Sequence, residues 1–263
     1  MTAGRLAELI RTQQPCVVLT GAGVSTESGI PDFRSPDGLW AQYDPLDYAS
    51  LASFRRDPVR IWDFYGRRLA FLVEAEPNDA HRALARLEAL GLVEAIVTQN
   101  IDLLHERAGS REVVEVHGSI RRAVCLSCGA AEPLSGVLAQ LSRGPAPYCP
   151  ACGAVLKPDV VFFGELLPVA AIDRAVDLAR RARLLLVVGS SLEVHPVAAL
   201  PFETLANGGA LAIVNRGPTP LDAHADVRLD GSAGEILSEV VGLLEEREEP
   251  PGLSPGERGS GRR

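Results

Sequence analysis

Two pairs of cysteines constrain the fold of this chain more than any other feature of its sequence. The pairs share one spacing, with two residues between the cysteines and a glycine directly after the second, and they are Cys125 with Cys128 and Cys149 with Cys152. Four thiolates in this arrangement are typical of a tetrahedral site for one Zn²⁺ ion, and glycine permits the tight turns that bring the sulfurs together. Because four sulfur ligands leave no position for water, we expect a structural zinc ion and not a catalytic one.

The same cysteines allow other interpretations. Disulfides or free thiols are the alternatives. We recognise no signal peptide and expect a cytoplasmic protein, in which both alternatives are disfavoured. A zinc ribbon can also bind nucleic acid, but the segment is a minor part of 263 residues with a net charge of -8. We therefore expect no nucleic acid partner. We also expect no membrane partner, because no run approaches the roughly 20 apolar residues that span a bilayer.

Apolar strands alternate with helical segments along most of the remaining chain. This alternation predicts an α/β fold, with a Rossmann-like parallel sheet covered by helices on both faces. Helical periodicity is expected over residues 1–14, 80–90 and 232–245, and a further helix is expected to begin near Ser25. The expected strands are residues 16–20, 92–98, 113–116, 184–188, 210–214 and 227–229.

Two segments interrupt that alternation. Residues 35–71 are helix-like and rich in aromatic side chains, and residues 119–157 contain the cysteine pairs. We expect these insertions to form a smaller helical and zinc-binding domain. The Rossmann-like domain would then comprise residues 1–34, 72–118 and 158–246. Residues 247–263 are rich in proline, glycine, serine and charge, which predicts a disordered tail.

Polar residues follow several of the predicted strands. Gly21 and Gly23 follow the first strand, and such a turn suits a pyrophosphate at a helix start. Alone, the pair also fits an ordinary tight turn, because Thr26 replaces the third glycine of the usual fingerprint. In open α/β sheets ligands bind at the carboxyl ends of strands, so the polar groups are expected to share one crevice. The others are Gln99, Asn100, Asp102, Gly189, Ser190, Ser191 and Asn215.

These motifs, in this order, resemble the signature of the sirtuin family, of the bacterial type, over residues 9–244. The resemblance implies an enzyme that consumes NAD as a co-substrate to remove acyl groups from the lysines of acylated proteins. The products would be nicotinamide, an O-acyl-ADP-ribose and free lysine. The motifs are residues 21–34, Thr98-Gln99-Asn100-Ile101-Asp102, Glu115-Val116-His117-Gly118, Phe162-Phe163-Gly164-Glu165, Gly189-Ser190-Ser191-Leu192 and Val214-Asn215, with the cysteine pairs in their usual place.

The resemblance also assigns roles to single residues. A lone histidine is more often structural, but His117 matches the general base of the family, and its ordinary pKa near 6.5 suits proton removal at neutral pH. The residues implied to flank the acyl-lysine peptide are Val161, Phe163, Gly164, Glu165 and Val194. Those implied to bind NAD are Gly21, Ala22, Gly23, Ser25, Asp32, Phe33, Arg34, Gln99, Asn100, Asp102, Gly189, Ser190, Ser191, Asn215 and Ala233.

Tyr65 and Arg68 bear on the choice of acyl group. They lie three residues apart on a predicted helix over residues 61–72, so they share a face. In one branch of the family a Tyr-x-x-Arg pair recognises the carboxylate of succinyl- or malonyl-lysine; otherwise the two are a core aromatic residue and an exposed arginine. Thr26 stands where that branch commonly has alanine, and we expect it to narrow the acyl pocket. We therefore expect deacetylation, with desuccinylation or demalonylation as an addition.

Three other classes of protein remain as alternatives. A protein ADP-ribosyltransferase would use the same NAD site. An NAD-dependent dehydrogenase would need a hydride-acceptor site, for which the sequence offers no obvious candidate. A non-enzymatic zinc module would not need His117 and Asn100. We expect a monomer.

Overall fold

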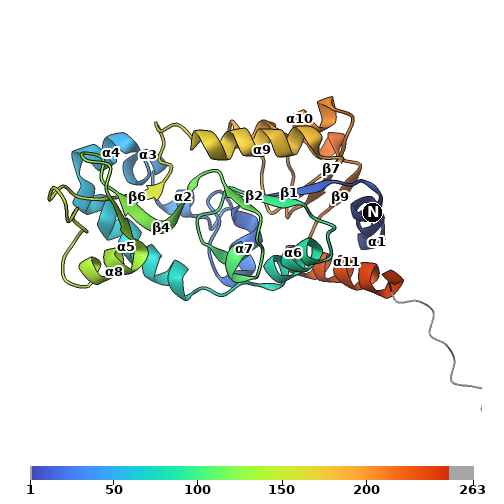
Figure 1. The fold of residues 1–263 in the computed structure, drawn as a ribbon, viewed down its shortest axis with the longest axis horizontal. Coiled ribbons are helices and arrows are strands. Elements are labelled where there is room, and N and C mark those ends of the chain that lie inside the picture. The colour runs from blue at the N-terminus through green and yellow to red at the C-terminus, as the bar shows by residue number, and fades with distance from the viewer. Residues whose placement is uncertain (1, 249–263) are drawn as a thin grey trace, which may run out of the picture.

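The computed structural model describes residues 2–248, and a parallel sheet forms the centre of its larger part (Figure 1). Its six strands are arranged in the order β3-β2-β1-β7-β8-β9, which confirms the predicted α/β class. Every residue of β1 and β7 is buried, as is typical of parallel strands covered on both faces. The strands are β1 (Cys16–Thr20), β2 (Ala95–Thr98), β3 (Val113–Glu115), β7 (Leu184–Val188), β8 (Ala210–Val214) and β9 (Val227–Leu229).

Helices cover the two faces of this sheet and give it two separate cores (Figure 1). On one face α1 (Ala3–Thr12), α6 (Asp79–Ala89) and α11 (Ala233–Glu248) bury their apolar side chains. On the other, α9 (Val169–Arg181) and α10 (Leu200–Ala206) do the same. The short elements between strands and helices are α7 (Leu104–Arg107), η2 (Val197–Ala199) and η3 (Asp222–His224).

The two insertions pack together beside the sheet as one unit. The indole N–H of Trp62, in the helical insertion, donates to the carbonyl of Leu156 in the cysteine segment at 2.6 Å. Both side chains belong to a third core, which includes residues of both insertions. The unit contains α2 (Leu39–Gln42), α3 (Pro45–Tyr48), α4 (Leu51–Arg56), α5 (Pro58–Glu74), α8 (Leu134–Leu141) and an antiparallel sheet of β5 (Ala131–Pro133), β4 (Gly118–Val124) and β6 (Lys157–Val160).

Several expected boundaries differ in the structure. The segment after β1 is not an α-helix but a short 3₁₀ helix, η1 (Ala22–Ser28), which ends at Gly29 in the left-handed conformation. Strand β2 begins at Ala95 and not at residue 92, because Gly91, with φ of +71°, first turns the chain away from α6. The three-stranded sheet continues to Val160, past the predicted limit of the insertion at residue 157.

Two further predictions concern the chain ends and membranes. The predicted tail, residues 247–263, falls almost wholly outside the described part of the chain. Within residues 2–248, no helix is long and apolar enough to cross a membrane.

Candidate active site

A cavity of about 920 Å³ lies between the parallel sheet and the smaller unit. Loops that follow β1, β2, β3, β7 and β8 line one side of it, and residues of the smaller unit line the other. His117 lines it, as does every residue predicted to bind NAD or the acyl-lysine peptide except Ala233. The carboxyl ends of the strands thus place the predicted polar groups around one space.

Three glycines at the floor of the cavity let two loops touch backbone to backbone. A Cβ atom at Gly23 would lie 2.8 Å from the carbonyl oxygen of Gly189, and one at Gly189 would lie 2.2 Å from the nitrogen of Val24. The N–H of Gly23 donates to Gly189 at 2.8 Å, and that of Gly21 donates to the Val188 carbonyl. These two N–H groups are therefore used within the protein, and the segment that follows is a 3₁₀ helix and not the expected α-helix, while a contact of this turn with the pyrophosphate of NAD stays a prediction.

Buried polar side chains behind η1 form a chain of hydrogen bonds around Ser25. The Ser25 hydroxyl donates to the Asp102 carboxylate at 2.7 Å and accepts from the Asn100 amide at 3.1 Å. Burial raises the pKa of Asp102, and the backbone N–H of Leu104 works against that rise. The network fixes the orientation of the Asn100 amide and the Asp102 carboxylate at the cavity.

Residues that follow β3 give the site its titratable base. His117 Nδ1 lies 3.1 Å from the carbonyl oxygen of Gln99. A carbonyl can only accept, so Nδ1 carries the proton and Nε2 is the free basic nitrogen of the neutral ring. Burial lowers the pKa of His117 below 6.5; the bond to Gln99 opposes this, and the charge of Arg34 adds to it. The imidazole is therefore neutral at pH 7 and able to accept a proton.

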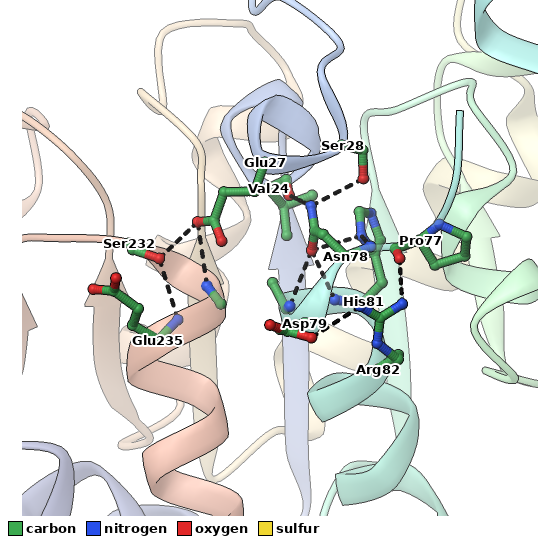
Figure 2. A network of polar contacts seen from close by, with 12 residues as sticks. Val24, Glu27, Ser28, Pro77, Asn78, Asp79, His81, Arg82, Ser232 and Glu235 are labelled. Carbon is green, nitrogen blue, oxygen red and sulfur yellow. Dashed lines mark hydrogen bonds and ion pairs between the residues drawn. The ribbon is translucent and has the colours of Figure 1, made fainter. Parts of the chain in front are cut away.

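Ala233 is not among the residues that line the cavity. It is buried at the start of α11, and its neighbours Ser232 and Gly234 donate to the Glu27 carboxylate at 2.9 and 3.3 Å. Figure 2 shows how these contacts hold η1 from one side, while Asn78 at the start of α6 holds it from the other. The start of α11 thus supports the loop after β1, and a contact between Ala233 and NAD stays a prediction.

The loop with Asp32, Phe33 and Arg34 forms the mouth of the cavity. Asp32 accepts from the N–H of Arg34 at 3.0 Å, which closes a tight turn. Phe33 stacks on Trp40 with ring centroids 5.3 Å apart, and Arg34 pairs with Glu193 at 3.5 Å across the cavity. Trp40 and Glu193 line the cavity as well, but neither belongs to a motif that could have identified it from the sequence.

Tyr65 and Arg68 lie together on α5 at the far end of the cavity. Tyr65 packs on Phe162, and burial raises the pKa of its phenol, which keeps the hydroxyl protonated. The Arg68 guanidinium lies 3.5 Å from the Phe64 ring centroid, and burial lowers its pKa. Among the described residues no carboxylate pairs with Arg68, and its guanidinium interacts with the hydroxyl of Tyr43. A half-buried cation without an acidic partner favours an anionic ligand.

Thr26 does not affect this end of the cavity. Its hydroxyl donates to the carbonyl of Gly23 at 2.9 Å, and the residue does not line the cavity. The expectation that Thr26 narrows the acyl pocket is therefore wrong, because the side chain is turned to its own 3₁₀ helix.

A buried ion pair that the sequence did not reveal holds the segment of Phe163 and Gly164 in place. Lys157 is the only lysine in the sequence, and its Nζ lies 2.9 Å from Glu165 and donates to the carbonyls of Pro158 and Val160. Glu165 also accepts from the N–H of Phe162 at 2.8 Å. The sequence shows that Lys157 is the only lysine, but its burial and its pairing with Glu165 depend on the fold.

Removing the lysine end of this pair is expected to destabilise the protein. Lys157→Met leaves the mostly buried Glu165 without its cation, and breaking such a pair costs about 3 kcal/mol. Lys157→Arg retains the charge and is the matched control. Urea unfolding followed by circular dichroism measures both variants, and equal stability of Lys157→Met and the wild type would contradict the expectation.

The four predicted metal ligands lie at one end of the smaller unit. Their sulfur atoms all lie within 4.8 Å of one another, and a tetrahedral Zn²⁺ with Zn–S bonds of about 2.3 Å would need sulfurs about 3.8 Å apart. The two turns match: Gly129 donates to the Cys125 carbonyl and Gly153 to that of Cys149, each at 2.9 Å. The backbone N–H of Cys128 lowers the pKa of the Cys125 thiol to about 6. The donor set fits one zinc ion with no position for substrate.

The fold and the cavity together define a nucleotide-binding α/β protein that carries a four-cysteine metal module. The model of the Sir2 family matches residues 21–196. The chain is 43% identical to an NAD-dependent protein deacylase of Pyrococcus furiosus, over 90% of this chain and 96% of the relative. It is 45% identical to an NAD-dependent protein deacetylase of Sulfolobus acidocaldarius, over 92% and 95%. This chain belongs to the Sir2 family, whose members are the sirtuins.

Solved structures agree with that assignment. One is a Sir2 protein with a deacetylated peptide and 3′-O-acetyl ADP-ribose, at a TM-score of 0.88 and 39% identity over 94% of this chain and 98% of that one. Another is a Sir2 protein bound to a propionylated peptide, at a TM-score of 0.85 and 38% identity over 94% and 99%.

Proposed function

We propose that this chain is an NAD-dependent protein-lysine deacylase with acylated proteins as its substrates. The observation that carries the proposal is a neutral histidine, His117, whose tautomer is set by Gln99 and whose ring lines the cavity that also contains the polar strand ends. NAD, when bound, supplies a glycosidic bond whose cleavage releases nicotinamide.

The residues of this chain bind NAD, exclude water and transfer a proton. Asn100 and Asp102 hold the nicotinamide and ribose side of NAD from the end of β2, fixed by Ser25. Phe33, stacked on Trp40 at the mouth, keeps water from the reacting carbon. His117 accepts a proton from a ribose hydroxyl through Nε2. Val161 and Phe163 line the space for the lysine stem.

Nicotinamide release that depends on an acylated peptide tests this function. Purified protein is incubated with NAD and a peptide that carries acetyl-lysine or unmodified lysine, and the products are analysed by mass spectrometry. We expect nicotinamide, O-acetyl-ADP-ribose and free lysine peptide with the acetylated substrate alone. Transfer of ADP-ribose to protein would favour the transferase alternative, and formation of NADH a dehydrogenase.

We further propose that the acyl pocket admits acids such as succinyl- and malonyl-lysine beside acetyl-lysine. Arg68, without an acidic partner in the described chain, and the protonated hydroxyl of Tyr65 support this scope. A charge-assisted hydrogen bond from arginine and a neutral one from tyrosine suit a carboxylate. The relatives reported above are archaeal, so assignment to the bacterial type stays a prediction.

Arg68→Met is expected to lower kcat/KM for a succinyl-peptide by about 10- to 100-fold, because charge-assisted hydrogen bonds contribute about 1.5–3 kcal/mol. The acetyl-peptide, which has no carboxylate, is expected to change by less than about threefold. Arg60→Met, on the same helix but outside the cavity, is the control. Loss of both activities in equal measure would contradict the carboxylate role.

A further inference from the structure

An arginine of the edge strand helps to hold the loop between β8 and β9. Arg228 lies in β9, and its side chain is 15% exposed. A guanidinium has five N–H donors, and those of Arg228 donate to several oxygens of this loop and of β9. Nε donates to Asp222 at 2.9 Å, Nη1 to the carbonyls of Asn215 at 3.0 Å and Leu229 at 2.5 Å, and Nη2 to the carbonyl of Gly217 at 2.5 Å and to Asp230 at 3.4 Å.

Two of these acceptors belong to the segment that lines the cavity, residues 215–218. Bonds to the carbonyls of Asn215 and Gly217 fix the path of the main chain, not only a side chain. Gly217 is in the left-handed conformation, with φ of +76°, and the Asn215 amide donates to the carbonyls of Arg216 and Gly217. Arg228 therefore sets the shape of one wall of the cavity from outside it.

The position of this wall in the sheet identifies the part of NAD that it faces. His117 follows β3, and Asn215 follows β8, four strands away in the order β3-β2-β1-β7-β8. Neighbouring strands lie about 4.8 Å apart, so the two sites are separated by about 19 Å. The bond cleaved in the reaction lies at the nicotinamide ribose, beside His117. The opposite half of the dinucleotide, which contains the adenosine, then reaches the end of β8.

We propose that Arg228 is a positioning residue for the adenosine half of NAD. The inference rests on the proposed function for the identity of the nucleotide. Arg228 does not line the cavity, so it acts through residues 215–218. Loss of Arg228 frees two carbonyls of this wall and removes the cationic donor of the Asp222 carboxylate. The wall then loses its fixed shape, while the peptide side, built from the smaller unit, keeps its contacts.

Arg228→Gln is expected to raise KM for NAD by about 10-fold, because NAD must then order residues 215–218 as it binds. The Kd of ADP-ribose, measured by calorimetry, is expected to rise by the same factor. KM for the acyl-peptide and kcat at saturating NAD are expected to stay unchanged. Arg228→Lys, which offers three donors of like charge, is expected to restore part of the affinity. Arg180→Gln, which breaks the pair with Glu203 at 2.9 Å outside the cavity, is the matched control.

Unchanged ADP-ribose affinity in Arg228→Gln would overturn the proposal. Equal rises in the KM of NAD and of peptide would also overturn it, because a general loss of structure affects both. If Arg228→Gln does not fold, Arg228→Lys decides by the same two readouts, with thermal unfolding as the check of folding. ADP-ribose binding does not need turnover, so a wild type that binds ADP-ribose but deacylates nothing would contradict the proposed function and leave the Arg228 test in force.

Discussion

His117→Ala is expected to lower kcat for deacylation by about 10²- to 10⁴-fold, the range that general bases contribute. The ring is the group at the cavity whose lowered pKa makes it a proton acceptor at neutral pH. The loss is expected in turnover and not in binding, because Asn100 and Asp102, which we propose to hold NAD, are left intact. Single-turnover nicotinamide and O-acyl-ADP-ribose assays at saturating NAD measure it.

A second cavity histidine gives the control. His195 lines the cavity and is exposed, and within the described residues its ring makes no hydrogen bond or ion pair. His195→Ala is therefore expected to keep most of the activity. The pH profile adds a readout specific to a base. Since burial lowers the pKa of His117 from 6.5, kcat/KM is expected to fall only as the pH drops below 6.5, where the ring becomes protonated. Full activity of His117→Ala, or an unchanged acidic limb in that variant, would contradict the assignment.

Much of the sheet could be predicted because its signals are local. Continuous apolar runs such as 184–188 bury both faces of a strand, and the order of polar strand ends follows from parallel connectivity. The same reasoning failed for the segment after β1. Its residues permit a helix, but the glycine contacts with Gly189, far along the chain, select a seven-residue 3₁₀ helix.

The candidate site shows a similar division. Motifs identified many of the residues that line the cavity, because those residue types occur at fixed places along the chain. Supporting residues could not be found this way, since their roles come from partners distant in sequence. Glu27 contacts Ser232 over 205 residues, and through this contact the start of α11 supports η1. The direction of the Thr26 side chain likewise depends on the local 3₁₀ turn.

Removal of zinc is expected to unfold the smaller unit while the parallel sheet persists. Binding of structural zinc contributes about 10–16 kcal/mol to small domains at pH 7. Cys125 and Cys149 are buried in the same core as Trp62 and Phe162, so loss of the ion separates residues that the metal ties together. The cavity wall from Val161 to Glu165 adjoins this core, and deacylation is therefore expected to be lost with it.

Tryptophan fluorescence reports this change directly, because both tryptophans of the sequence, Trp40 and Trp62, lie in the helical insertion. Trp62 is 2% exposed and hydrogen-bonded to Leu156, so a red shift of the emission is expected when a strong chelator removes the metal, and added zinc should reverse it.

Metal analysis is expected to give one zinc per chain in the wild type and in Cys16→Ala, whose thiol lies in β1, but none in Cys128→Ser. A metal-free protein with unchanged emission and full activity would show that the cysteines need no ion to hold the smaller unit together. Because the sheet has its own two cores, its far-ultraviolet dichroism should survive chelation in large part, and the unfolding will not be two-state.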